Sequence, residues 1–67
     1  MDLKIARLEA KRTQWSLYLL TGIHQSTLSL IENGYIFPDT EEKQRIAEAL
    51  GMQVSDIDWP KVERVFV

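Results

Sequence analysis

Residues 13–34 read TQWSLYLLTGIHQSTLSLIENG, two short runs free of helix breakers that meet at Gly22. Thr13 is a residue type that accepts hydrogen bonds from the free amides at the start of a helix. Gly22 can adopt the positive φ that ends a helix. These two signals predict a very short helix over residues 14–20.

The run after Gly22 predicts a second short helix, over residues 25–33. Leu28 and Ile31 are three residues apart, which places both on one face of a helix. Asn33-Gly34 is a strong helix stop, because these two residue types tolerate the left-handed backbone. The centre of the chain is therefore expected to be two helices joined by a tight turn.

Further helices are predicted on both sides of this centre. Residues 3–11 contain no glycine or proline, and their apolar side chains recur at helical spacing. A later helix begins after Asp39 or Thr40 and ends at Gly51, with two carboxylates in its first turn. The apolar face predicted for the first helix is broad and consists of Leu3, Ile5, Ala6, Leu8 and Ala10.

A fifth helical turn is predicted near the end of the chain. Ser55 or Asp56 is expected to cap it, and Ile57 and Trp59 lie within it before Pro60 interrupts. No pair of strands and no internal repeat is predicted. The sequence therefore predicts an all-α fold, a compact bundle of five short helices.

The composition excludes several classes of protein. Sixty-seven residues are enough for one small domain, whose stability must come from packing. The chain has no cysteine and a single histidine, so neither a disulfide nor a zinc site is available. There is also no phosphate-binding loop and no histidine beside a nucleophile. We therefore expect a protein that is not an enzyme and needs no cofactor or metal.

The charge is unevenly distributed along the chain. A net charge of −2 argues mildly against a polyanionic partner. Residues 1–12, however, carry four basic and two acidic side chains, whereas residues 39–59 carry two basic and six acidic ones. The longest uncharged stretch, residues 13–31, is rich in polar side chains and predicts no membrane segment. These features predict a soluble cytoplasmic protein with a basic N-terminal end.

An ordered set of motifs runs through the chain: Gln14-x-x-Leu17, Gly22-Ile23-x-Gln25-Ser26-Thr27-Leu28-Ser29-x-Ile31-Glu32-Asn33-Gly34, Pro38, and Arg45-Ile46-Ala47-Glu48-Ala49-Leu50-Gly51. Together they resemble the lambda-repressor-like (Cro/cI, XRE-type) helix-turn-helix family over residues 3 to about 59. The resemblance implies a five-helix domain that binds double-stranded DNA, usually as a transcriptional repressor or regulator. Its third helix would enter the major groove.

The resemblance also indicates which side chains would contact DNA. Thr13, Gln14 and Asn33 match positions that contact the phosphate backbone, and Lys11 and Arg12 are the best placed cations. Glutamine can pair with adenine, serine with several base edges, and leucine with the thymine methyl group. The complete predicted set is Lys11, Arg12, Thr13, Gln14, His24, Gln25, Ser26, Thr27, Ser29, Leu30 and Asn33.

Two internal contacts follow from the same resemblance. Arg7 and Glu32 match a pair in which an arginine of the first helix meets the glutamate that closes the third, so we expect a partly buried ion pair. Gln25 matches a position beside Gln14, where two amides would hold each other's orientation. Both contacts would fix the reading helix against the rest of the domain.

The C-terminal end suggests a dimer. Family members read two half-sites, and a single small module gives little specificity. We therefore expect residues 1–59 to form the helix-turn-helix domain and residues 60–67 to form an apolar tail that contacts a second copy in a homodimer. The expected dimer surface consists of Trp59, Val62, Val65, Phe66 and Val67.

Several positions depart from the family pattern toward apolar residues. Tyr18 replaces a small residue, so either the two central helices splay or the ring turns outward. Exposed apolar side chains that lie together mark an interface. The alternative function is therefore a helix-turn-helix scaffold that serves as a protein-interaction or antitoxin-like module with little DNA binding. Its protein partner would contact Tyr18, Leu19, Leu20, Tyr35, Ile36 and Phe37.

Overall fold

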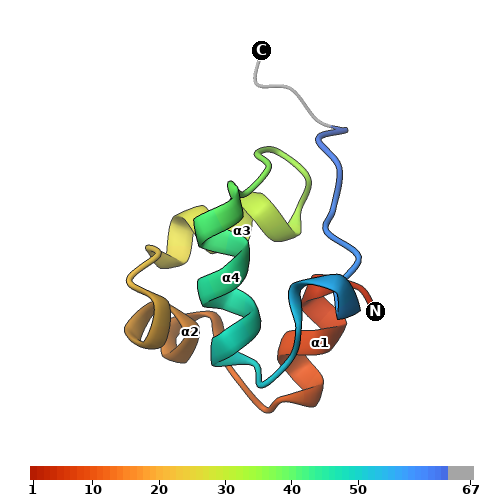
Figure 1. Cartoon of the computed structure of the whole chain (residues 1–67). Coiled ribbons are helices and arrows are strands. Elements are labelled where there is room, and N and C mark those ends of the chain that lie inside the picture. Colours follow the sequence, from red (N-terminus) through yellow and green to blue (C-terminus); the bar gives the residue numbers. More distant parts are fainter. Residues whose placement is uncertain (64–67) are drawn as a thin grey trace.

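Each helix of the protein begins at a side chain that binds its free amides. The computed structural model describes residues 1–63, and four α-helices and one 3-10 turn follow one another along them (Figure 1). Residues 1–63 contain no β-strand, so the predicted all-α class is confirmed for that range. The elements are α1 (Leu3–Glu9), α2 (Gln14–Thr21), α3 (Gln25–Glu32), α4 (Thr40–Ala49) and the 3-10 turn η1 (Val54–Asp56).

The predicted starts of α2 and α4 are confirmed. The Thr13 hydroxyl accepts a hydrogen bond from the Ser16 amide at 3.0 Å, and the Ser16 hydroxyl accepts one from the Thr13 amide at 3.0 Å. Asp39, not Thr40, is the residue before α4, and it forms the same reciprocal pair with Glu42. These capping boxes satisfy two of the amides that each helix start leaves free.

The first helix ends earlier than predicted, at Glu9. Lys11 has a φ of +57°, in the left-handed region that favours glycine. The amide of Lys11 donates to the Leu8 carbonyl, and that of Arg12 donates to the Arg7 carbonyl, both at 3.0 Å. This pair of bonds is a Schellman ending with lysine in the place of glycine. The sequence prediction missed it because lysine is no stop signal.

The predicted fifth helix, with Ser55 or Asp56 as its cap, is wrong, because residues 1–63 form four helices and a 3-10 turn that follows Gln53. Only residues 54–56 are helical there, and Ile57 is extended and buried. The amide of Asp58 donates to the Met1 carbonyl at 2.6 Å. Because this segment pairs with the start of the chain, it leaves helical geometry before Trp59, whose indole N–H donates to the Val54 carbonyl at 3.1 Å.

The core lies where α2 packs against α3 and α4. Its largest fully buried side chains are Leu3, Leu17, Leu28, Ile31, Ile46 and Pro38. The apolar face of α1 is narrower than predicted, because Ile5 and Leu8 are about half exposed, at 51% and 56%. No helix within residues 1–63 has the length and apolar character needed to cross a bilayer.

Leu17 and Leu19 lie on the same helix and differ in burial, at 0% and 66% exposed. We expect Leu17→Ala to lower the free energy of unfolding by about 2–5 kcal/mol, because it leaves a cavity among α2, α3 and α4. Leu19→Ala should change it by less than about 0.5 kcal/mol. Urea denaturation followed by circular dichroism measures both values. Equal losses in the two variants would contradict this packing.

Candidate nucleic-acid interface

Three residues, Gly22 to His24, connect α2 to α3. Gly22 has a φ of +76°, and its amide donates to the Tyr18 carbonyl at 2.8 Å, which ends α2 as predicted. The Thr21 hydroxyl donates to the Leu17 carbonyl at 2.7 Å and accepts from the Ile23 amide at 3.1 Å. Thr21 is buried, and sequence reasoning did not single it out. It fixes the turn that orients α3 against α2.

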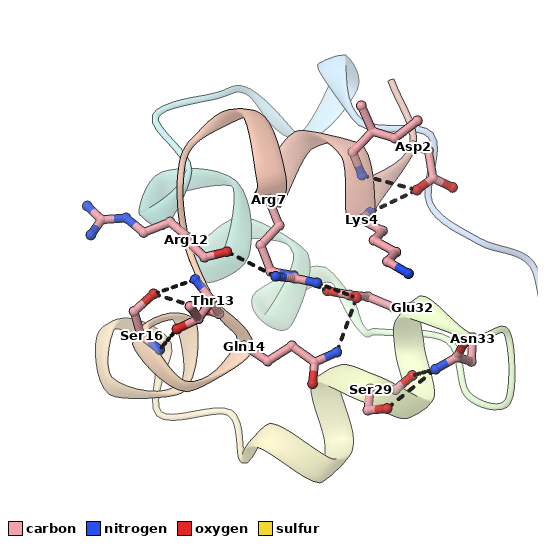
Figure 2. A network of polar contacts seen from close by, with 11 residues as sticks. Asp2, Lys4, Arg7, Arg12, Thr13, Gln14, Ser16, Ser29, Glu32 and Asn33 are labelled. Atoms are coloured by element: carbon pink, nitrogen blue, oxygen red, sulfur yellow. Dashed lines mark hydrogen bonds and ion pairs between the residues drawn. The ribbon is translucent and has the colours of Figure 1, made fainter.

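A buried ion pair joins α1 to the end of α3 (Figure 2). Arg7 Nε donates to Glu32 Oε2 at 2.7 Å, and Arg7 Nη2 donates to Glu32 Oε1 at 3.2 Å. The side chains are 9% and 3% exposed. The predicted pair is confirmed, and its side chains are nearly fully buried. Arg7 Nη1 also donates to the Arg12 carbonyl at 3.0 Å, which ties the turn before α2 to the same centre.

Gln14 is held by this ion pair. Its Nε2 donates to Glu32 Oε1 at 3.2 Å, and Figure 2 shows the amide reaching from the start of α2 toward α3. Among residues 1–63, no hydrogen bond joins Gln14 to Gln25, whose side chain is exposed. The predicted pairing of the two amides is therefore wrong. A carboxylate is a stronger acceptor than an amide oxygen, so Gln14 turns to Glu32.

The predicted reading residues lie along one helix, α3, and its cap. His24, Gln25 and Ser26 are exposed, and Thr27, Ser29 and Leu30 are half-buried. At the far end, Asn33 Nδ2 donates to the Ser29 carbonyl at 2.8 Å and to the Ser29 hydroxyl at 3.3 Å. The exposed polar side chains are thus concentrated at the N-terminal end of α3.

The aromatic ring of Tyr18 lies between two exposed rings. Its centroid is 5.3 Å from that of Trp15 and 5.3 Å from that of His24. Tyr18 is half-buried and borders the core. It connects the first turn of α2 to the residue that precedes α3.

Lys11 and Arg12 are exposed in the turn before α2. The guanidinium of Arg12 points away from the ion pair, although its backbone carbonyl binds Arg7 (Figure 2). Helix α3 carries no lysine or arginine. Any cationic contact to a ligand lying along α3 must therefore come from neighbouring segments.

The apolar residues predicted for a protein partner do not form one patch. Leu19 and Leu20 on α2 are more than half exposed, and Phe37 is 48% exposed. Figure 1 places α2 and the loop that contains Phe37 at opposite ends of the molecule. Tyr18, Tyr35 and Ile36 are only half-buried, and Tyr18 and Ile36 pack against the core. The expected contiguous surface is therefore two separate regions.

Comparison with known families gives a match over most of the chain. The family model HTH_3, described as helix-turn-helix, matches residues 3–57. That range contains α1 to α4 and η1. No curated protein and no solved structure matches the chain.

A double-mutant cycle tests the ion pair between α1 and α3. We expect Arg7→Met and Glu32→Met each to lower the free energy of unfolding by about 3–5 kcal/mol, because each leaves the other charge buried without its partner. The double variant should lose less than either single variant, since no buried charge remains. Urea denaturation of all four proteins measures the coupling. If the losses of the two single variants add up to the loss of the double variant within about 0.5 kcal/mol, the two residues are independent.

Proposed function

Because the chain belongs to the helix-turn-helix family HTH_3, a family of DNA-binding domains, we propose that it is a sequence-specific transcriptional regulator, acting as a repressor in the cytoplasm. The proposal places α3 in the major groove of double-stranded DNA. One observation carries it: the polar residues at the N-terminal end of α3 are exposed, while a buried ion pair holds the other end of that helix. A helix that presents its first residues to base edges needs this arrangement.

In the proposal, the first turn of α3 reads bases. Gln25 is exposed and its side chain makes no hydrogen bond within residues 1–63, so its side-chain amide is available for bidentate pairing with adenine. His24 and Ser26 flank it. Ser29, Thr27 and Leu30 follow within the next turn, where Leu30 suits a thymine methyl group.

The phosphate contacts are proposed for the segment before α2 and for the end of α3. Lys11 and Arg12 supply the charge, and Thr13 and Gln14 lie at the start of α2, where the helix dipole favours an anion. Gln14 Nε2 carries a second hydrogen besides the one that binds Glu32. Asn33 completes the set. These contacts position the protein without reading sequence.

A homodimer is part of the proposal, with residues 1–59 as the domain and residues 60–67 as the tail. Trp59 is half-buried and Val62 is 51% exposed. The amide of Glu63 donates to the Gly34 carbonyl at 3.1 Å, so the described part of the tail runs beside the loop after α3. Val65, Phe66 and Val67, also expected at the dimer surface, lie outside the described residues.

A second function is supported by the exposed side of α2. Trp15, Leu19 and Leu20 are each more than half exposed, and Trp15 and Leu19, four residues apart, lie on one face of α2. This supports a protein-interaction module as the alternative. The two functions differ in their ligand: the alternative predicts a stable complex with a protein and negligible retention of the chain on double-stranded DNA.

The DNA-binding proposal predicts a shallow salt dependence. Each phosphate neutralised by a cation contributes about 0.9 to the slope of log affinity against log salt, so Lys11 and Arg12 of two protomers give a slope of about −2 to −4. Lys11→Glu combined with Arg12→Glu should abolish binding without unfolding the domain. Fluorescence anisotropy with a selected DNA site, at several salt concentrations, measures both effects.

The matched control is Lys43→Glu combined with Arg45→Glu, which changes the net charge equally on α4. We expect this control to weaken binding far less, because its two cations face Phe37 and Glu41 rather than the proposed phosphates. Equal loss in both double variants, or none in the first, would place the DNA-binding surface elsewhere.

The dimer surface has its own test. We expect the full chain to sediment as a dimer at micromolar concentration, and a chain that ends at Pro60 to sediment as a monomer, because the truncation removes the apolar tail. A full chain with Val62→Asp should behave like the truncated one. Monomers in both the full and the truncated chain would remove the tail as an interface.

A further inference from the structure

The cap of α3 differs chemically from the caps of the other helices. Asp2, Thr13 and Asp39 bind the free amides of their helices through oxygen atoms. His24 does so through a ring nitrogen: its Nδ1 accepts a hydrogen bond from the Ser26 amide at 3.1 Å. The residue that caps the reading helix thus has an aromatic ring whose second nitrogen, Nε2, does not take part in the cap.

This bond determines where the ring carries its proton. A backbone N–H can only donate, so Nδ1 must present a lone pair to it. The neutral imidazole then carries its single hydrogen on Nε2. Histidine tautomers are set by such partners, and here the partner is the helix backbone itself.

The same bond fixes the direction of the Ser26 hydroxyl. Ser26 Oγ lies 2.8 Å from His24 Nδ1. Nδ1 has one lone pair and no hydrogen to give, so the hydroxyl contacts it as a donor that shares this lone pair with the Ser26 amide, and Oγ presents its own lone pairs to other neighbours. A serine hydroxyl ordinarily rotates to suit any partner, but this one donates to the ring and is therefore an acceptor toward any other partner.

Ring packing holds the arrangement in place. The imidazole lies 5.3 Å from the Tyr18 ring at an interplanar angle of 47°, and Tyr18 contacts Trp15 edge to face. His24 and Ser26 remain exposed. Within residues 1–63 no hydrogen bond is made by His24 Nε2, which is left as a donor at the start of α3.

We propose that His24 and Ser26 form a specificity-determining pair of fixed polarity, in which His24 Nε2 is a donor and Ser26 Oγ an acceptor toward the major groove. This inference rests on the proposed function. Guanine presents two acceptors in the major groove, N7 and O6, whereas adenine and thymine present one each, so guanine suits the His24 donor best. Cytosine N4 and adenine N6 are donors and suit Ser26. If cytosine lay opposite His24, its N4 donor would face the Nε2 donor, and no hydrogen bond could form.

The protonation pattern is tested first in the free protein. Long-range ¹H–¹⁵N correlation spectra at pH 7.5 distinguish a protonated from an unprotonated imidazole nitrogen, and the chain has only one histidine. We expect an unprotonated Nδ1 and a protonated Nε2 for His24. A spectrum with hydrogen on Nδ1 would overturn the proposal, whatever the protein binds.

The second test compares selected DNA sites for the parent chain and His24→Asn. Asparagine is among the best cap residues, so this variant retains an acceptor for the Ser26 amide but lacks the Nε2 donor. We expect the preference for guanine at one position to fall by about 2- to 10-fold, the value of one net hydrogen bond, with the other positions unchanged. Ser26→Ala should relax a different position, and Ser55→Ala on η1, the matched serine control, should change none.

The possible outcomes distinguish base reading by His24 from the proposed DNA-binding function. Suppose that the parent chain selects a defined site. If His24→Asn then selects the same site, or binds all sites more weakly by one factor, base reading by His24 is overturned and the DNA-binding function stands. A parent chain that retains no DNA overturns both. Circular dichroism melts of each variant identify any change that comes from loss of the fold.

Discussion

The buried ion pair between Arg7 and Glu32 is the contact on which the rest of the domain depends. Burying two charges costs several kcal/mol per ion, and the cost is recovered only when the geometry is good and the remaining polar atoms are satisfied. Here the guanidinium makes three hydrogen bonds and the carboxylate accepts three. Within residues 1–63, no buried side-chain nitrogen or oxygen lacks a partner. The pair therefore fixes its neighbours instead of destabilising them.

Three segments meet at this pair, which explains how so small a domain orients a helix-turn-helix. Arg7 comes from α1, Glu32 ends α3, and Gln14 begins α2. The Arg12 carbonyl brings in the turn between α1 and α2, and that turn requires Lys11 in the left-handed region. Apolar packing can hold helices together at many angles, whereas hydrogen bonds to one carboxylate permit few. The ion pair thus sets the orientation of the helices, and the core around Leu17 and Leu28 stabilises them through buried apolar surface.

Local signals in the sequence predicted most of the helices, because a single residue type at the right position can start or end a helix. Thr13, Gly22 and Asp39 act through their own side chain or backbone, so their positions could be read directly. The end of α1 could not, since its stop is a lysine held in place by long-range contacts. The prediction of a fifth helix failed for the same reason, because Asp58 pairs with Asp2 and with the Met1 carbonyl at the start of the chain. Of the candidate site, the sequence predicted the polar residues at the N-terminal end of α3, whereas the hydrogen bond of Gln14 to Glu32 instead of Gln25 appeared only in the structure.

The charge distribution and the hydrogen bonds of α3 lead to one view of how this domain would select its site. A reading helix without lysine or arginine gains little non-specific affinity, so discrimination must come from the arrangement of donors and acceptors. Such discrimination is poor when hydroxyls and imidazoles are free to rotate or to move their protons, because each group then adapts to the wrong base. The cap bond of α3 removes that freedom at His24 and Ser26, using a backbone amide that every helix start leaves free. In the proposed function, stability and specificity at this end of the helix would therefore depend on the same hydrogen bond.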